Sequence, residues 1–329
     1  MSGFSRLTLA PSPHIKTEED IRSIMTDVVI ALMPALAIAV FTFGMRAFIV
    51  TAVSVLGCVF FEWGYRKVLK KPSSIGDLSA VVTGILLAYC LPVTIPLWVV
   101  IIGDFVAIVI VKQLFGGIGK NFMNPALLAR AVLFSWPVMM ATWAEPRTAL
   151  PVFKTPVDVI STATPLSYLK GGNMPADSIM EMALGQTAGC IGEISAVALV
   201  AGGLYLLYRR VITLRIPLSF IGTVALLTFL FPKGGADNVQ FMLCELLSGG
   251  LMLGAIFMAT DYTTSPVTRK GQIIFGIGCG ALTVFIRYFG SYPEGVSYAI
   301  LIMNALVWPI DKYTRPRVFG TARHRIGGR

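Results

Sequence analysis

One short polar segment carries the residues best suited to chemistry in this chain. The stretch DVISTATPLSYLK, residues 158–170, places one aspartate and three Ser or Thr residues within seven positions. A catalytic hydroxyl needs a neighbouring base, but the two histidines, His14 and His324, lie near the chain ends. Attachment of a group by an external enzyme needs only an accessible hydroxyl with small neighbours. Thr164, between an alanine and a proline, meets that description, although an ordinary Ser/Thr turn explains the segment as well.

Acidic residues within apolar segments form a second group. Asp104 lies in the middle of one apolar segment, and Glu193 lies a turn or two inside another. An aspartate at the centre of a membrane helix costs about 2.5–3.5 kcal/mol on insertion scales, so it is usually retained for function. We therefore expect Asp104 and Glu193 to be candidates for an ion pathway. Asp77 and Glu245 open short apolar segments, where helix capping is an equally good explanation.

Two loops rich in Gly, Asn and Thr form a third group, GGIGKNFMNPA at 116–126 and TDYTTSPVTRKG at 260–271. Neither contains a Walker A sequence, because Gly-Lys is followed by Asn, and neither belongs to a βαβ unit. The loops could line a polar pocket for a flavin or a quinone, or they could be helix-capping turns. The candidate pocket residues are Asn121, Asn124, Asp261 and Thr264.

The composition is that of a helical membrane protein. The 329 residues are 55% hydrophobic and 13% charged, with a mean hydropathy of +0.76, whereas soluble chains carry about 25% charged residues. We predict an all-α polytopic protein with about ten transmembrane helices. The predicted spans are 25–43, 47–64, 78–91, 95–114, 125–142, 186–208, 214–231, 241–259, 272–289 and 295–310. The third is too short to cross alone and should continue as covered, non-helical backbone.

The distribution of positive charge predicts the orientation. The net charge of +10 does not indicate a nucleic-acid partner, because the basic residues cluster between apolar segments. Most of the 27 Lys and Arg residues fall on one side when the N-terminus is placed in the cytoplasm. Both termini should then be cytoplasmic, and the segment 143–185 should face outward.

This outward loop leaves five predicted spans on either side, which indicates an inverted duplication. DLSAVVTGILLA at 77–88 is similar to ELLSGGLMLGA at 245–255, and NPALLARA at 124–131 is more loosely similar to YAILIMNA at 298–305. The expected organisation is a cytoplasmic segment 1–24, a first five-helix repeat 25–142, an extracytoplasmic loop 143–185 carrying the attachment site, a second repeat 186–310 and a basic cytoplasmic tail 311–329.

Metal chemistry is not predicted within this chain. The five cysteines are widely spaced without a C-x-x-C pair, so spacing alone builds neither a zinc site nor an iron–sulfur cluster. They are either small membrane residues or ligands shared with a partner protein. An electron carrier of this composition would need an organic cofactor.

The segment D-x-x-S-T-A-T resembles the acceptor motif for covalent flavinylation, in which a flavin transferase links FMN through its phosphate to the last threonine. The matching residues are Asp158, Ser161, Thr162, Ala163 and Thr164. Together with ten spans, the outward loop and the two polar loops, this motif makes the whole chain similar to the NqrB/RnfD family. The first span begins near residue 25, without the long extension of the NqrB branch, so the RnfD branch is the more similar one.

The resemblance implies a fold akin to urea transporters, FMN on Thr164 as a phosphate ester, and room for a second, non-covalent riboflavin. It implies a flavoprotein subunit of an ion-translocating oxidoreductase, the Rnf complex, in a prokaryotic cell membrane. That complex passes electrons between ferredoxin and NAD⁺ and couples them to Na⁺ or H⁺ transport. Its expected partners are RnfA, RnfB, RnfC, RnfE and RnfG. The alternatives are an NqrB-type subunit of a Na⁺-translocating NADH:quinone reductase and a solute channel of the same fold without redox function.

Overall fold

The computed structural model describes residues 20–148, 150–152, 162–235 and 237–316. Helices joined by loops make up this part of the chain, and it contains no β-strand. Among these residues, three helices are long and apolar enough to cross a membrane: α1 (Ile21–Phe43), α2 (Met45–Val68) and α13 (Arg269–Phe289). A fourth span is possible where α11 (Asn238–Leu247) and the segment Leu251–Met258 pass together with a bend of 65°. The chain is therefore a helical protein of the membrane type.

Shorter apolar helices complete the bundle. They are α3 (Ser79–Tyr89), α9 (Ala196–Tyr208), α10 (Arg215–Leu230) and α14 (Val296–Ala305). The helix α4 (Leu97–Phe105) continues as the π-helix η2 (Val106–Gln113), and α12 (Leu251–Leu253) continues as the π-helix η3 (Gly254–Met258). π-Helical turns often mark functional sites, and η2 borders one of the pockets described below.

The predicted span at 78–91 is a short helix that continues as non-helical backbone, as expected. The 3-10 turn η1 (Ile75–Asp77) precedes α3, and the Asp77 carboxylate accepts bonds from the Ser79 N–H at 2.8 Å and the Ser79 hydroxyl at 2.5 Å. After α3 the backbone is non-helical and meets a second non-helical segment in an antiparallel bridge between Pro92 and Cys190. The N–H groups of Ile191 and Gly192 donate to Leu91 O and Tyr89 O, each at 3.0 Å. Two interrupted segments thus satisfy each other's backbone within the protein.

Several predicted boundaries were wrong. The span at 125–142 is two helices, α5 (Pro125–Leu133) and α6 (Pro137–Met140), because the residue before a proline disfavours helical geometry. The span at 186–208 becomes helical only at Ala196, so Glu193 lies in a turn before α9 and not inside a helix. Glu245 does not open a helix either, since it lies in the last turn of α11.

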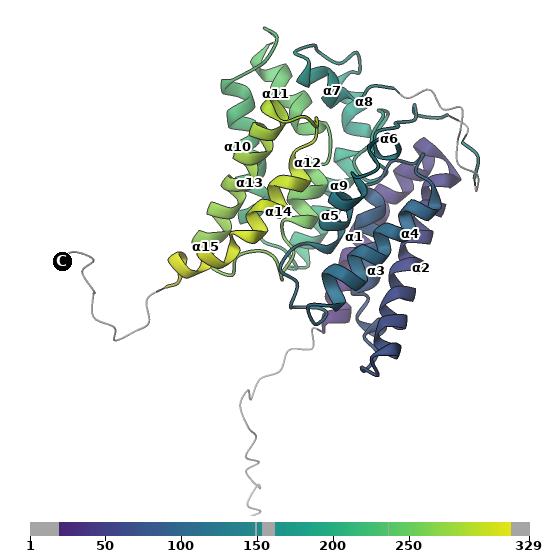
Figure 1. Ribbon diagram of the computed structural model, residues 1–329. Coiled ribbons are helices and arrows are strands. Elements are labelled where there is room, and N and C mark those ends of the chain that lie inside the picture. The colour runs from purple at the N-terminus through teal and green to yellow at the C-terminus, as the bar shows by residue number, and fades with distance from the viewer. Residues whose placement is uncertain (1–19, 149, 153–161, 236, 317–329) are drawn as a thin grey trace, which may run out of the picture.

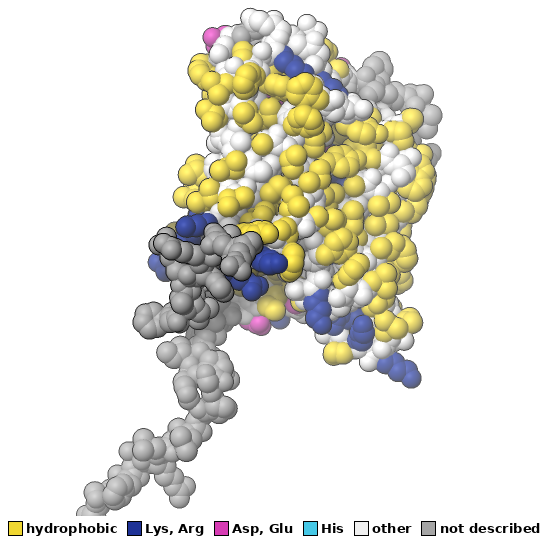
Figure 2. Space-filling model, turned by 60° about the vertical axis from the view of Figure 1, so that its left-hand side comes forward, with side chains coloured by type: hydrophobic (Ala, Val, Ile, Leu, Met, Phe, Trp, Pro, Cys, Tyr) yellow, Lys and Arg dark blue, Asp and Glu magenta, His cyan; other side chains and the backbone are white. Residues whose placement is uncertain are grey.

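The two ends of the bundle differ (Figure 1). The start of α1 and the end of α15 (Val307–Thr314) lie at the lower end, whereas α7 (Pro165–Lys170) and α8 (Ile179–Leu184) lie at the upper end with α11. Figure 2 shows Lys and Arg gathered mainly at the lower end of one face, beneath a broad hydrophobic surface. The described ends of the chain therefore share the more basic side.

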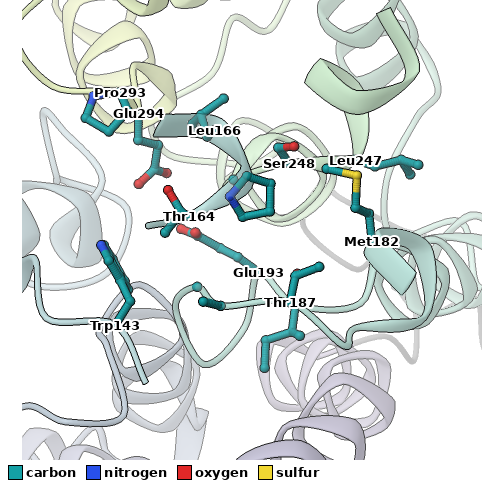
Figure 3. Close-up of a pocket in the computed structure, with 15 residues that line it drawn as sticks. Trp143, Thr164, Leu166, Met182, Thr187, Glu193, Leu247, Ser248, Pro293 and Glu294 are labelled. Carbon is teal, nitrogen blue, oxygen red and sulfur yellow. The ribbon is translucent and has the colours of Figure 1, made fainter. Parts of the chain in front are cut away.

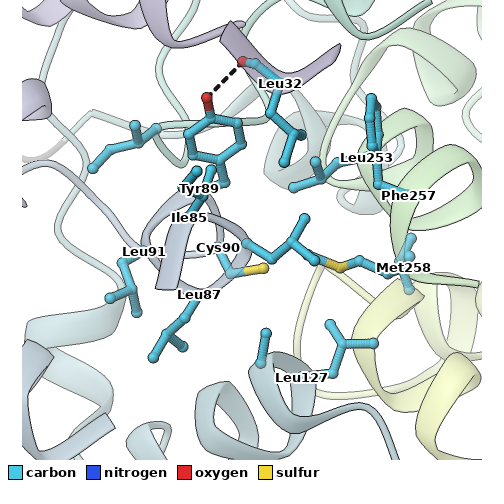
Figure 4. Packing of buried hydrophobic residues seen from close by; sticks show 14 of the residues in the cluster. Leu32, Ile85, Leu87, Tyr89, Cys90, Leu91, Leu127, Leu253, Phe257 and Met258 are labelled. Carbon is cyan, nitrogen blue, oxygen red and sulfur yellow. Dashed lines mark hydrogen bonds between the residues drawn. The ribbon is translucent and has the colours of Figure 1, made fainter. Parts of the chain in front are cut away.

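The core joins both halves of the sequence. Figure 4 shows Leu87 and Cys90 from the first half in the same apolar cluster as Leu253 and Met258 from the second. The buried Tyr89 hydroxyl donates to Leu32 O at 2.7 Å, which ties α3 to α1. One continuous apolar cluster thus holds the interrupted segments in place.

Candidate functional site

Thr164 is fixed at the start of α7. It is the N-cap residue, and proline at the first helical position favours this geometry. The helix packs through Leu166 and Leu169 against Phe241 and Cys244 of α11, all buried. The segment containing the candidate attachment site is therefore docked on the bundle.

Thr164 borders a small, partly open hollow with a cavity volume of about 50 Å³. Trp143, Glu193, Ser248 and Glu294 line it as well. Figure 3 shows the Thr164 hydroxyl and the two carboxylates pointing toward the same space. The hollow thus combines a hydroxyl, an indole and two acids from segments far apart in sequence.

The neighbouring motif residues differ from Thr164. Thr162 is engaged with Trp143, since its N–H donates to Trp143 O at 3.1 Å and its hydroxyl lies 3.4 Å from the same oxygen. The side chain of Ala163 is exposed. Asp158 and Ser161 lie outside the described residues. Of the three described motif residues, only Thr164 lines the hollow.

A buried arginine organises the acids of this pocket. Arg130 of α5 donates through Nη1 to Glu294 Oε1 at 2.9 Å and to Ser297 Oγ at 2.7 Å, and Nη2 pairs with Glu294 Oε2. Its Nη1 also lies 3.5 Å from Glu193 Oε1. Arg130 therefore connects α5 with the start of α14 and holds both carboxylates beside Thr164.

The same cluster is a poor metal site. Ligand atoms of Cys190, Glu193 and Glu294 lie within 4.8 Å of one another. The Arg130 guanidinium, however, already contacts both carboxylates and lies 3.5 Å from Cys190 Sγ. Its positive charge occupies the place that a metal cation would need, so the geometry favours an ion-pair cluster.

A second, larger pocket of about 330 Å³ brings the two Gly/Asn/Thr loops together. Asn121, Asn124 and Asp261 line it. Thr264 does not line it but donates to Asp261 Oδ2 at 3.0 Å. Burial raises the pKa of the Asp261 carboxyl above its ordinary value. The four residues predicted for one pocket are therefore neighbours.

Two asparagines of this pocket have different roles. Asn124 is the N-cap of α5, where its Oδ1 accepts from the N–H groups of Ala126 and Leu127 at 3.1 and 3.3 Å. Asn121 Oδ1 is buried and has no hydrogen-bond partner among the described residues. The capping explanation thus holds for Asn124, whereas Asn121 presents an unused acceptor.

A buried ion pair forms part of the wall of the larger pocket and was not predicted. Lys112 of η2 donates to Glu62 Oε2 at 2.9 Å and to Ser79 Oγ at 2.6 Å, and the Gln113 amide donates to Glu62 Oε1 at 2.8 Å. Both Lys112 and Ser79 line the pocket. Lys112 falls at the end of a predicted span, where the sequence suggested only an interfacial charge.

Asp104 lies apart from both pockets. Its side chain is fully buried between α2 and α4, where Oδ1 is bonded to Ser54 Oγ at 2.6 Å and to Cys58 Sγ at 3.4 Å. Its Oδ2 has no hydrogen-bond partner in the described part of the chain. The structure does not bring Asp104 together with Glu193, the other acid predicted for an ion pathway.

Sequence comparison relates the chain to known proteins. A sequence model of the NQR2, RnfD, RnfE family matches residues 8–320. The chain is 48% identical over 321 residues, 96% of each chain, to the D subunit of the Na(+)-translocating ferredoxin:NAD(+) oxidoreductase complex of Acetobacterium woodii. It is 45% identical over 330 residues, 96% of this chain and 97% of the relative, to the D subunit of the proton-translocating ferredoxin:NAD(+) oxidoreductase complex of Clostridium ljungdahlii.

Proposed function

The chain belongs to the NQR2, RnfD, RnfE family, and we propose that it is the D subunit of an ion-translocating ferredoxin:NAD⁺ oxidoreductase complex in a prokaryotic cell membrane. Near-full-length identity to two proteins that carry this name supports the assignment. Its partners would be RnfA, RnfB, RnfC, RnfE and RnfG, with a flavin transferase for maturation. One relative is named for Na⁺ and the other for protons, so membership alone does not select the ion.

We propose that Thr164 carries FMN through a phosphate ester. The flavinylation-like motif supports this, and so does the position of Thr164 at a partly open hollow with an indole in its wall. Thr162, the nearest competing hydroxyl, is engaged with Trp143. When bound, a flavin supplies one-electron chemistry that no side chain of this protein provides.

A non-covalent riboflavin in the larger pocket is the second part of the proposal. The cavity volume of about 330 Å³ lies within the usual range of small-molecule sites. The unpartnered Asn121 Oδ1 fits the ring N–H of an isoalloxazine. Lys112 and Asp261 would provide polar contacts to the ring or the ribityl chain. These residues fit a polar, uncharged cofactor held by hydrogen bonds.

The chain's own residues would orient and insulate the cofactor on Thr164. The α7–α11 packing fixes the attachment point, Trp143 lies at the hollow, and Arg130 holds the two carboxylates in place. Because Arg130 is buried, its contacts with the carboxylates are stronger than they would be in bulk water. The residues around Thr164 would therefore influence how easily an electron is added to the cofactor.

We further propose about ten membrane crossings in two inverted halves, with both termini cytoplasmic. The antiparallel arrangement of α5 and α14 supports this: Arg130 near the end of α5 binds Ser297 at the start of α14, and Asn124 at the start of α5 lies 3.2 Å from the Asn304 amide at the end of α14. Elements related by an inverted repeat run in opposite directions across the membrane. Thr164 would then face outward, where an exported flavin transferase can reach it.

The decisive experiment compares Thr164→Val with the matched control Thr162→Val, each expressed with the other Rnf proteins and a flavin transferase. Thr164→Val should remove covalent flavin fluorescence from the denatured gel band, and Thr162→Val should retain it. Mass spectrometry of the peptide spanning 158–170 should find the added mass of FMN only where Thr164 is present. If the Thr164→Val band is still fluorescent, the acceptor is Thr162 or Ser161 and not Thr164.

A further inference from the structure

The wall of the hollow beside Thr164 carries more negative than positive charge. Glu193 and Glu294 both line the hollow, whereas its lining residues include no lysine, arginine or histidine. Arg130 lies behind the two carboxylates and, in the described part of the chain, is the one cationic side chain paired with them. Two carboxylates and one guanidinium leave one negative charge over. Such a charge in a largely buried place is strongly unfavourable unless a cation or a proton neutralises it.

The neighbouring arginine does not supply the missing positive charge. Arg287 binds the Glu245 carboxylate at 2.6 Å and donates to Ser248 O at 3.1 Å. Its charge is therefore already matched by another glutamate. The ion pairs around the hollow then comprise two arginines and three glutamates, and one negative charge remains.

Glu193 presents the least satisfied oxygen of this cluster. Its side chain is only 7% exposed, and its Oε1 atom is buried without a hydrogen bond to the described residues. The Arg130 Nη1 atom is 3.5 Å from this oxygen, which is longer than an ordinary hydrogen bond. Figure 3 shows the Glu193 carboxylate turned toward the space that Thr164 and Glu294 also face. A buried acceptor without a donor thus points into the hollow.

The hollow has the size and the chemistry for a small metal cation. Its cavity volume of about 50 Å³ leaves room for a few water-sized particles. Hard metal cations are bound by oxygen atoms. Five of the lining side chains carry oxygen: Thr164, Thr187, Glu193, Ser248 and Glu294.

The two carboxylates converge on one small space. A Cβ atom added at Gly250 would lie 2.5 Å from Glu294 Oε1 and 2.8 Å from Glu193 Oε1. The guanidinium of Arg130 contacts the same carboxylates from the side of Cys190, so the hollow is the side left for a cation. A divalent ion would reverse the net charge next to Arg130, and charge balance therefore favours a monovalent ion.

We propose that the hollow binds one small monovalent metal cation, such as Na⁺, through the carboxylates of Glu193 and Glu294. The site needs no cofactor, because all of its residues belong to this chain. A phosphate ester on Thr164 would add negative charge beside the same carboxylates and would increase the demand for a cation. A proton shared by the two glutamates would also balance the charge, but it would need no cavity.

The test measures binding of radioactive Na⁺ to the purified full chain, produced without a flavin transferase and kept at one pH. Choline chloride holds the total salt concentration constant, so that screening does not change. The wild type should bind one Na⁺ per chain. Glu193→Gln and Glu294→Gln should each weaken binding by at least about tenfold, because one unit of negative charge beside the cation is lost. Glu181→Gln, an exposed change in α8, is the control and should bind as the wild type does.

Denaturant unfolding separates cation binding from a purely structural role of Glu193. Na⁺ should raise the unfolding midpoint of the wild type and of Glu181→Gln, because a ligand that binds the folded state stabilises it. The midpoint of Glu193→Gln should not respond to Na⁺. Without Na⁺ it should be at least as high as that of the wild type, since the variant lacks the unbalanced charge. A structural glutamate predicts a lower midpoint at every Na⁺ concentration.

Three results would overturn the proposal. The first is no saturable Na⁺ binding by the wild type, which would leave a shared proton as the balancing charge. The second is equal binding by the wild type and both Gln variants, which would place the ion elsewhere. The third is a wild-type unfolding midpoint that does not change with Na⁺. Absence of FMN mass on the 158–170 peptide would overturn only the proposed flavin attachment, because the Na⁺ measurements use chain that never met a transferase.

Discussion

Replacing Arg287 with methionine tests the buried ion pair that supports the helix break beneath the Thr164 pocket. Arg287 of α13 binds the Glu245 carboxylate at 2.6 Å and also donates to Glu245 O at 2.7 Å and Ser248 O at 3.1 Å. The side chains of both partners are 2% exposed or less. Ser248 and Gly249, which follow α11, line the hollow. The arginine thus satisfies both a buried charge and the free carbonyls at the end of α11.

The expected loss follows from this geometry. Removing one member of a buried ion pair costs about 3–5 kcal/mol, because the remaining charge is left without compensation. Arg287→Met should lower the free energy of unfolding by that amount. The double variant Arg287→Met/Glu245→Met removes the stranded charge and should recover most of the loss, but not all, since the two carbonyls remain unpaired.

The assay is denaturant unfolding in detergent micelles, followed by circular dichroism. Arg269→Met, an exposed change at the start of the same helix, is the matched control and should alter the free energy by less than about 0.5 kcal/mol. A loss below about 1 kcal/mol for Arg287→Met would contradict the buried-pair reasoning. The same holds if the double variant is no more stable than the single one.

Three further changes test other parts of the structure. Gly192→Ala should destabilise the fold by about 1–3 kcal/mol in the same assay, because its Cβ would overlap the Tyr89 ring; an unchanged midpoint would contradict the close packing of the two bridged segments. Asn121→Ala should release non-covalent flavin while leaving covalent fluorescence and stability intact, and retention of extractable riboflavin would argue against the larger pocket. Ser178→Ala should remove the α8 cap at a cost of about 1 kcal/mol, measured as faster hydrogen exchange in α8; unaltered exchange would show that packing alone holds the helix.

Local signals in the sequence predicted some features correctly. The short segment at 78–91 was too brief to span. The Asp77 carboxylate accepts from the Ser79 N–H at the start of α3, although the N-cap residue itself is Leu78. The loops at 116–126 and 260–271 were grouped by composition, and they meet at one pocket. These features depend on short-range chemistry. Helix capping is one example, and the clustering of polar loops away from lipid is another.

Other features depend on contacts that no local pattern contains. Glu294 pairs with Arg130 across 164 positions, and spacing gives no reason to connect them. Glu193 was assigned to a span because its surroundings are apolar; those neighbours are buried by protein, and hydropathy cannot distinguish protein burial from lipid burial. An arginine inside an apolar segment was the one available signal, since such a charge needs an internal partner.

The bridge between the two interrupted segments also affects how the protein is made. Tyr89 O and Leu91 O receive their donors from Gly192 and Ile191, and the neighbouring Cys90 O accepts from Cys190, 100 residues later in the chain. While a ribosome has synthesised only the first half, these carbonyls lack those donors, which is costly in a bilayer. The first half should therefore remain with insertion factors or chaperones until the second half emerges, and a nascent chain truncated between the halves should be cleared by membrane proteases.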